Sequence, residues 1–154
     1  MEIKKFKKLF AEFSSNILLQ RHGKFWLFQA SMNDECKVRI SLQDSNWSKK
    51  FYVNIEIFIL GLFEFPEVGP IENTQAVGHL FRREPPEYAE VFDLESSILD
   101  SERELRLRDF FSKFLQPFLC SVVTIAGITE QEKRNELHVF PAVKAQMLKM
   151  RVDE

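Results

Sequence analysis

The stretch KVRISLQDSNWSKKFYVNIEIF, from Lys37 to Phe58, decides the fold, because most other segments are suited to packing against it. Apolar and polar residues alternate from Lys37 to Gln43 and again from Phe51 to Ile57. A period of two places apolar side chains on one face of a sheet and polar ones on the other. The polar run Asp44-Ser45-Asn46 between them is typical of a turn. The stretch therefore predicts two antiparallel strands joined by a loop.

Length and composition predict a single domain that spans residues 1–154. The chain is 45% hydrophobic and 29% charged, which is ordinary for a soluble protein. It holds 16 Phe but only 2 Trp and 2 Tyr, and a side chain with large apolar area and no polar group is suited to a core. The net charge of −2 argues against a general nucleic-acid binder.

Several expectations concern where the protein resides. No apolar run is long enough to cross a bilayer, and the N-terminal segment lacks the continuous apolar region of a signal peptide. We therefore expect a cytoplasmic protein with no membrane partner. Cys36 and Cys120 fit no metal spacing, and in a reducing compartment they are expected to be free thiols.

The segments around the central stretch predict helices and further strands. Apolar residues at helical spacing predict an amphipathic helix from Glu2 to Leu19, and a second apolar stripe from Leu107 to Phe118 predicts a helix that covers a sheet. Pro117 is expected to kink that second helix or to open another, and Thr129 with Glu132 is a candidate capping box. Additional strands are expected at three ranges, and a last helix is expected to begin at Pro141. The three strand ranges are Phe25–Ala30, Val77–Arg83 and Tyr88–Leu94.

Together these elements predict an α+β fold, in which an antiparallel meander is covered on one face by the N-terminal helix and the C-terminal helices. Lysines at positions 4, 5, 7 and 8 lie on one side of the first helix, either as a solvated face or as an attraction for an acidic partner or membrane surface. The apolar run that follows the central stretch either joins the core or forms a homodimer contact. The residues of that candidate contact are Phe58, Leu62, Phe63 and Phe65.

No pattern in the chain identifies a catalytic site. The chain has no Gly-rich phosphate loop, no nucleophile elbow and no H-E-x-x-H motif, and its three histidines lack ligand-type neighbours at metal-site spacing. We therefore expect no cofactor, no metal and no catalytic residue. Enzymatic activity stays open, but a constellation of catalytic residues is what an enzyme would need.

Two sets of residues are candidate binding sites. His79, Arg82 and Arg83 could clamp a carboxylate or a phosphate, although a solvated loop with local ion pairs explains them equally. The second set is the polar face of the central strands with Trp47 at the hairpin tip, which is suited to protein recognition. The outer face of a sheet that is covered on one side is polar in any case, so a merely solvated face stays open as the alternative. The second set comprises Arg39, Gln43, Trp47, Tyr52, Asn54 and Glu56.

The motif Gln43-Asp44-Ser45, followed by Phe51-Tyr52-Val53-Asn54, resembles a bacterial family catalogued only as a domain of unknown function. The N-terminal helix and Gly78-x-Leu80 fit the same layout, over roughly the first half to two thirds of the chain. The chain departs from the family at Ala76-Val77, where an arginine is expected, and it lacks the downstream tryptophan-rich element. The resemblance implies a small α+β domain of bacterial source and supplies no catalytic residue.

Two functional hypotheses follow. The first is a cytoplasmic interaction module, of an accessory or immunity type, that binds another bacterial protein. The second is a domain that binds a small molecule or phosphate, with or without enzymatic activity, and with His79, Arg82 and Arg83 as its ligand-binding residues.

Overall fold

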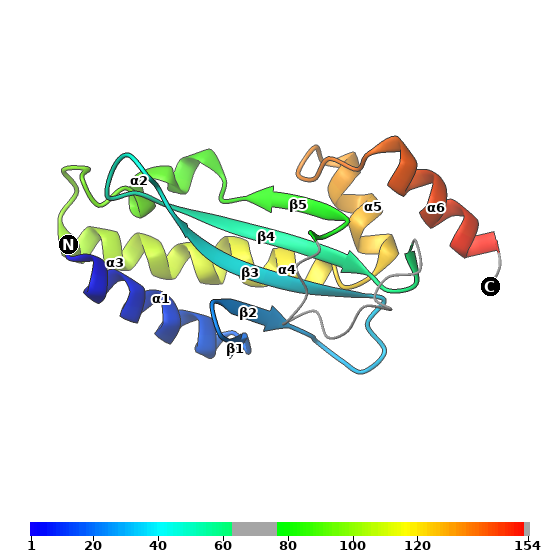
Figure 1. The fold of residues 1–154 in the computed structure, drawn as a ribbon, viewed down its shortest axis with the longest axis horizontal. Helices are drawn as coiled ribbons and strands as arrows, with labels where there is room; N and C mark the ends of the chain where they lie inside the picture. Colours follow the sequence, from blue (N-terminus) through cyan, green and yellow to red (C-terminus); the bar gives the residue numbers. More distant parts are fainter. Residues whose placement is uncertain (63–76, 153–154) are drawn as a thin grey trace.

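A computed structural model describes residues 1–62 and 77–152 of the chain (Figure 1). The elements in order are α1 (Ile3–Asn16), β1 (Gln20–His22), β2 (Phe25–Phe28), β3 (Cys36–Asp44), β4 (Phe51–Ile59), β5 (Leu80–Arg83), the 3₁₀ turn η3 (Pro86–Tyr88), α2 (Ala89–Phe92), α3 (Asp100–Asp109), the π-helical segment η4 (Phe110–Leu115), α4 (Gln116–Ser121), α5 (Ile125–Lys133) and α6 (Pro141–Val152).

The five strands form one antiparallel sheet in the order β1-β2-β3-β4-β5, which confirms the predicted meander and the α+β class. The central pair, β3 and β4, is paired over nine residues, with Val38 opposite Ile57 and Gln43 opposite Tyr52. We call the sheet face that carries Val38 and Ile57 the inner face, and the face that carries Gln43 and Tyr52 the outer face. The alternation of the central stretch produces these two faces directly.

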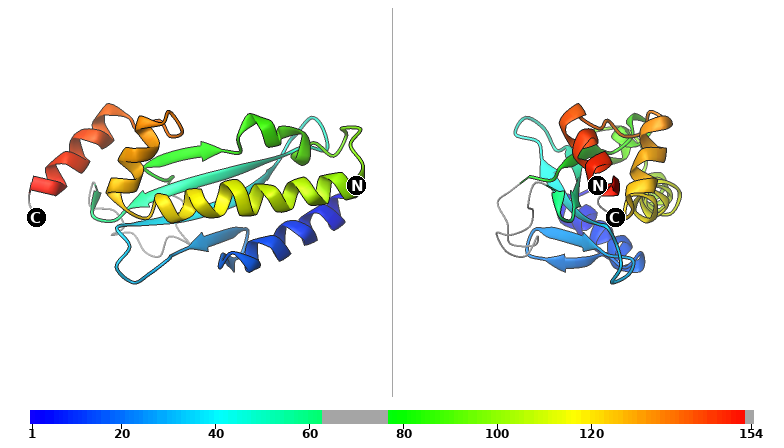
Figure 2. Two further views of the ribbon diagram at one scale, coloured as in Figure 1. Left: turned by 180° about the vertical axis from the view of Figure 1, so that it is seen from behind. Right: turned by 90° about the vertical axis from the view of Figure 1, so that its right-hand side faces the viewer.

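The helices cover the inner face (Figures 1 and 2). The segments α3, η4 and α4 follow one another as a single long rod beside α1, whereas α5 and α6 lie at the end of the sheet away from the β3–β4 hairpin tip. Pro117 lies in the first turn of α4, directly after the π-helical segment, where its missing N–H is tolerated. Pro141 begins α6, as expected.

Phenylalanine rings fill the space between this rod, α1 and the sheet. The Phe6 ring stacks on Phe51 of β4 at a centroid distance of 5.3 Å, and the Phe10 ring lies edge-on to Phe111 at 5.0 Å. Edge-to-face and offset pairs at such distances are the favourable arrangements of aromatic side chains. The phenylalanine-rich composition is therefore used mainly in the core, as expected.

The N-terminal helix ends earlier than predicted, at Asn16, because the chain reverses there in a Schellman motif. The Leu19 N–H donates to the Ser14 carbonyl, and Leu18 takes a positive φ of 66°. Of the helix-borne lysines, Lys5 pairs with Asp100 and Lys7 with Asp44, both at 3.8 Å. This face of α1 is exposed to solvent in the structure.

Two local predictions are wrong. Tyr88–Leu94 is not a strand but forms the end of η3 and α2, because Pro85 and Pro86 favour a helical turn and the buried Arg103 binds the carbonyls at its far end. The cap of α5 is Thr124 rather than Thr129, since the Thr124 hydroxyl accepts the N–H of Gly127.

Two of the four residues of the candidate homodimer contact are buried and cannot form it. Phe58 and Leu62 are 0% and 1% exposed, so these side chains belong to the interior. Phe63 and Phe65 lie outside the described residues.

The two cysteines have opposite environments. Cys36 begins β3 and is buried, and burial raises the pKa of its thiol to about 12, with the nearby Glu35 and Asp34 carboxylates adding to the effect. Cys120 lies on α4 and is exposed. Both are free thiols.

Candidate functional site

Three side chains, one from each of three strands, form a hydrogen-bonded cluster on the outer face, and a fourth side chain, Tyr52, stacks against it. The Asn54 amide donates to Gln43 Oε1 at 2.9 Å, and Arg83 donates to Asn54 Oδ1 at 3.3 Å and to Gln43 Oε1 at 3.4 Å. The Arg83 guanidinium also lies over the Tyr52 ring, 4.5 Å from its centroid. We call Gln43, Tyr52, Asn54 and Arg83 the outer-face cluster.

The strand register explains why these residues meet. Gln43 of β3 is opposite Tyr52 of β4, and Asn54 of β4 is opposite Arg83 of β5, so the four side chains occupy neighbouring outer-face positions. The sequence placed the first three in one candidate set and Arg83 in another. The structure joins the two sets through β5.

Positive charge dominates the outer-face cluster. The Lys50 ammonium lies 5.2 Å from the centroid of the Tyr52 ring, on which Arg83 also stacks. The nearby Glu84 carboxylate accepts the N–H of Val53, and burial raises its pKa. Among the described residues, neither Arg83 nor Lys50 forms an ion pair with a carboxylate, and both are partly or fully exposed.

Arg82 lies on the opposite side of the sheet from Arg83, because successive strand residues point to opposite faces. Its guanidinium contacts the rings of Phe114 and Phe118, 4.7 and 5.0 Å from their centroids, and pairs with Glu136 at 3.1 Å. The proposed clamp of two neighbouring guanidinium groups beside a histidine is therefore not assembled as one site.

His79 lies beside the last residue of β4, Ile59. Its Nδ1 accepts the backbone N–H of Ile59 at 2.9 Å, and its ring lies edge-on to Phe58 at a centroid distance of 6.4 Å. Burial lowers the pKa of His79 below its ordinary value of 6.5. The imidazole is thus held neutral as a hydrogen-bond acceptor.

Arg39 and Glu56, which the sequence placed on an exposed polar face, are instead buried. They are 3% and 9% exposed, and their side chains form a bidentate ion pair with N–O distances of 3.0 to 3.2 Å. Arg39 also stacks on Phe25 and Phe58, and Glu56 accepts the N–H of Gly78. Alternation correctly assigned their face, but it could not show that this part of the face is covered.

A cavity of about 440 Å³, the outer pocket, adjoins the outer-face cluster. Phe81, Val77 and Phe140 give it an apolar and well-exposed rim, with exposed fractions of 49%, 81% and 55%. The sequence did not single out these three residues, since an isolated exposed apolar residue carries no signal until the fold brings it beside others. Its described lining residues are Asn54, Glu56, Val77, Gly78, His79, Phe81 and Phe140.

Trp47 lies at the tip of the β3–β4 hairpin and is 95% exposed. Its backbone N–H bonds the Ser45 hydroxyl, which fixes the turn, but the indole does not fold back onto Phe51. An aromatic side chain this exposed on a loop is available for contact with another molecule.

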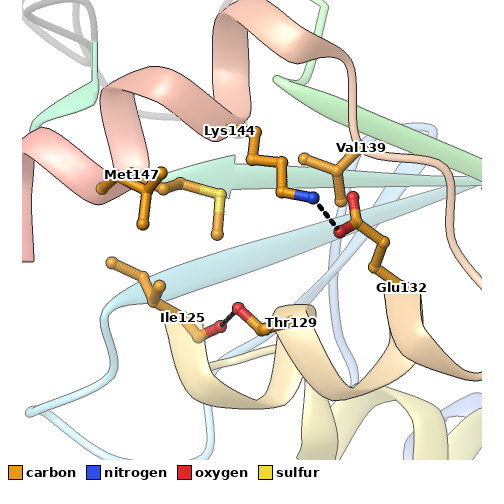
Figure 3. A pocket seen from close by; sticks show the side chains of 7 residues that line it. Ile125, Thr129, Glu132, Val139, Lys144 and Met147 are labelled. Carbon is orange, nitrogen blue, oxygen red and sulfur yellow. Dashed lines mark hydrogen bonds and ion pairs between the residues drawn. The ribbon is translucent and has the colours of Figure 1, made fainter.

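Two further cavities lie on the helical side. A groove of about 580 Å³, the inner groove, borders β5, η3 and α4, and its lining includes Arg82, Tyr88, Phe114, Phe118 and Arg134. A smaller apolar pocket of about 80 Å³ separates α5 from α6, where Lys144 and Glu132 close one side by an ion pair of 2.8 Å (Figure 3). That pocket is too small for more than a few atoms.

The described residues contain no group of three side chains arranged to hold a metal ion. None of the described helices is long and apolar enough to cross a membrane.

The environment of His79 predicts a pH-dependent stability. Because the pKa of His79 is lower in the folded state, the unfolded chain binds more protons than the folded chain below pH 6.5. The free energy of unfolding should therefore fall as the pH drops through 6.5 towards the folded pKa. Above pH 6.5 this loss should be absent. His79→Asn keeps an acceptor near the Ile59 N–H and should remove this component. Urea titrations between pH 5 and 8 test it, with the exposed His22→Asn as control. An equal slope in wild type and His79→Asn would contradict the assignment.

Comparisons with known proteins give no relationship on which identity can rest: no family model, no curated protein and no solved structure matches this chain.

Proposed function

We propose that this protein is a cytoplasmic binding module that holds another bacterial protein through its outer face, in an accessory or immunity role. The observation that supports this is the outer-face cluster, in which Arg83 and Lys50 flank Tyr52 and form no ion pair with any carboxylate of the described residues. Interface cores favour tyrosine and arginine, because both combine a large contact area with directional hydrogen bonds. Trp47 extends the same surface at the hairpin tip.

The charge of this surface favours an acidic partner. A partner carboxylate can complete the hydrogen bonds of the Arg83 fork, and charge-assisted pairs of this kind are the stronger hydrogen bonds in proteins. The neutral amides of Gln43 and Asn54 hold that fork in place, so little ordering is needed on binding.

A second candidate function is the binding of a small anion or metabolite, which the outer pocket favours. The pocket is concave, has an apolar rim, and contains the His79 ring and the Asn54 amide, to which Arg83 donates. Thermal-shift titration with phosphate and with small carboxylates tests this, and a shift that Arg83→Ala abolishes would favour it over a protein partner.

The charge at Arg83 gives the decisive test of protein binding. Arg83→Glu is expected to weaken binding of the partner by at least about tenfold, because attraction becomes repulsion. The partner is first captured from a bacterial lysate, identified by mass spectrometry and purified, and its affinity is then measured by calorimetry.

Lys133→Glu, an equal charge reversal at an exposed position of α5, is the matched control and should leave the affinity unchanged. Unchanged affinity in both Arg83→Glu and the double variant Trp47→Ala/Asn54→Ala would remove the outer face from the interaction.

A further inference from the structure

The edge of the sheet at β5 has backbone groups whose direction follows from the register. In the β3–β4 pair, the Leu60 N–H donates to the Glu35 carbonyl and the Ser45 N–H donates to the Lys50 carbonyl. Because bonded pairs alternate along an antiparallel ladder, the even-numbered residues of β4 bond to β3 and the odd-numbered ones face β5. The Val53 N–H fits this, since it bonds the Glu84 carboxylate beside β5.

The same alternation places the groups of β5. Leu80 and Arg82 are opposite Ile57 and Ile55, so their N–H and C=O groups bond to β4. The N–H and C=O of Phe81 and Arg83 therefore point away from the sheet. Among the described residues, no hydrogen bond to these four backbone groups is present outside the β4 ladder.

Two cavities lie on opposite faces of the sheet beside this edge. Phe81 lines the outer pocket of about 440 Å³, and Arg82 lines the inner groove of about 580 Å³. A strand paired with β5 would send successive side chains to the two faces in turn. Strand addition gains affinity from main-chain bonds and specificity from pockets for alternate side chains, and β5 supplies both.

We infer that the open edge of β5 is a strand-addition site for an extended, acidic segment of a partner protein. The inference rests on the proposed function, because Arg83 belongs to both surfaces. On the outer side, Arg83 would bind a carboxylate of the partner, and the exposed rings of Phe81 and Phe140 would pack against an apolar side chain. On the inner side, the Arg82 guanidinium lies over the Phe114 and Phe118 rings and is paired with Glu136, so the preference for an acidic segment rests on Arg83.

A second copy of this chain fits the edge poorly. Antiparallel pairing of two β5 strands would bring Arg82 and Arg83 of one copy close to the same residues of the other. Like charges directly opposite each other destabilise a strand pair.

Amide hydrogen exchange on the full chain tests the inference. The probes are peptides selected for binding from a library of random 12-residue sequences. We expect acidic residues to be enriched in them, and we expect bound peptide to slow exchange at the amides of Phe81 and Arg83 by at least tenfold. The amides of Leu80 and Arg82 should already exchange slowly in the free protein, because they bond to β4.

Two variants at one position separate the backbone from the side chain. Phe81→Ala and Phe81→Pro both remove the ring and keep Arg83, but only Phe81→Pro also removes the outward N–H. Proline is tolerated in an edge strand at a position whose N–H faces away from the sheet. Phe81→Pro should bind the peptides at least tenfold more weakly than Phe81→Ala, with circular dichroism confirming that both fold. If Phe81→Pro does not fold, the exchange measurement on the wild type decides alone.

Several results would overturn the inference. Peptides that shift Tyr52 and Gln43 signals while Phe81 and Arg83 amides exchange freely would exclude strand addition and leave the outer-face function intact. Equal affinity of the two Phe81 variants, or no enriched peptide, would also exclude it, whereas the Arg83→Glu measurement judges the proposed function separately. A wild-type dimer in sedimentation that Phe81→Pro dissociates would assign the edge to a second copy.

Discussion

Replacing Gly127 with alanine is expected to lower the free energy of unfolding by about 4 kcal/mol, which would be among the larger effects of a single substitution. A Cβ atom at this position would overlap the backbone oxygen of Ser121 and lie 2.6 Å from its carbonyl carbon. Neither atom belongs to a side chain that can rotate away. The first turn of α5 would have to separate from the end of α4, and the Gly127 N–H would lose its bond to the Thr124 hydroxyl.

The adjacent residue provides the matched control for this prediction. Ala126→Gly exchanges the same two residue types in the opposite direction, at an exposed position of the same turn. It should lower the free energy of unfolding by only about 1 kcal/mol, through the lower helix propensity of glycine. Urea unfolding followed by circular dichroism measures both variants. A loss of less than about 1.5 kcal/mol in Gly127→Ala would mean that α4 and α5 are not packed as described.

Arg103→Met is expected to cost a similar amount, about 4 kcal/mol, because it removes a buried set of hydrogen bonds and leaves the buried Val91 carbonyl without its donor. Arg103 is 1% exposed, and its Nη1 donates to the carbonyls of Glu90, Val91 and Asp93 at 2.8 to 2.9 Å. Its Nη2 donates to the Ser96 hydroxyl and carbonyl. Methionine keeps the length of the aliphatic stem and removes all five bonds.

The effect should be concentrated in one segment of the chain. Hydrogen exchange at Ala89–Phe92 should rise sharply in Arg103→Met, since the carbonyl end of α2 loses its donor. Arg106→Met is the control, because Arg106 binds Glu90 and the Glu87 carbonyl of the same segment from a more exposed position. This substitution should lower the free energy of unfolding by about 1 kcal/mol or less. Equal costs for the two variants would contradict the role assigned to Arg103.

The sequence predicted the sheet well because local alternation reports which side of a strand is buried. Val38, Ile40, Val53 and Ile55 all face the helices as their spacing indicated. The α2 segment was mispredicted because its stabilising donor, Arg103, lies ten residues or more along the chain, outside any local pattern. Helix or strand preference in a short segment is easily overridden by such a tertiary contact.

The candidate site was only partly predictable for a similar reason. Gln43, Tyr52 and Asn54 were recognisable from the alternation of one hairpin, but Arg83 joins Gln43 across 40 residues of chain. That contact depends on the register of β5 against β4, and a one-residue shift would have sent Arg82 to the outer face instead. Likewise, the burial of Arg39 and Glu56 depends on what lies over the sheet rather than on the strands themselves.

The contrast between the two cysteines makes the native chain suitable for oriented attachment. Maleimides react with thiolates, so the buried Cys36, whose thiol pKa is about 12, should stay unmodified while Cys120 reacts. Cys120 is on α4, in the helical layer behind the sheet. A protein tethered to a sensor chip through this thiol would therefore present its outer face to the solution without any engineered residue.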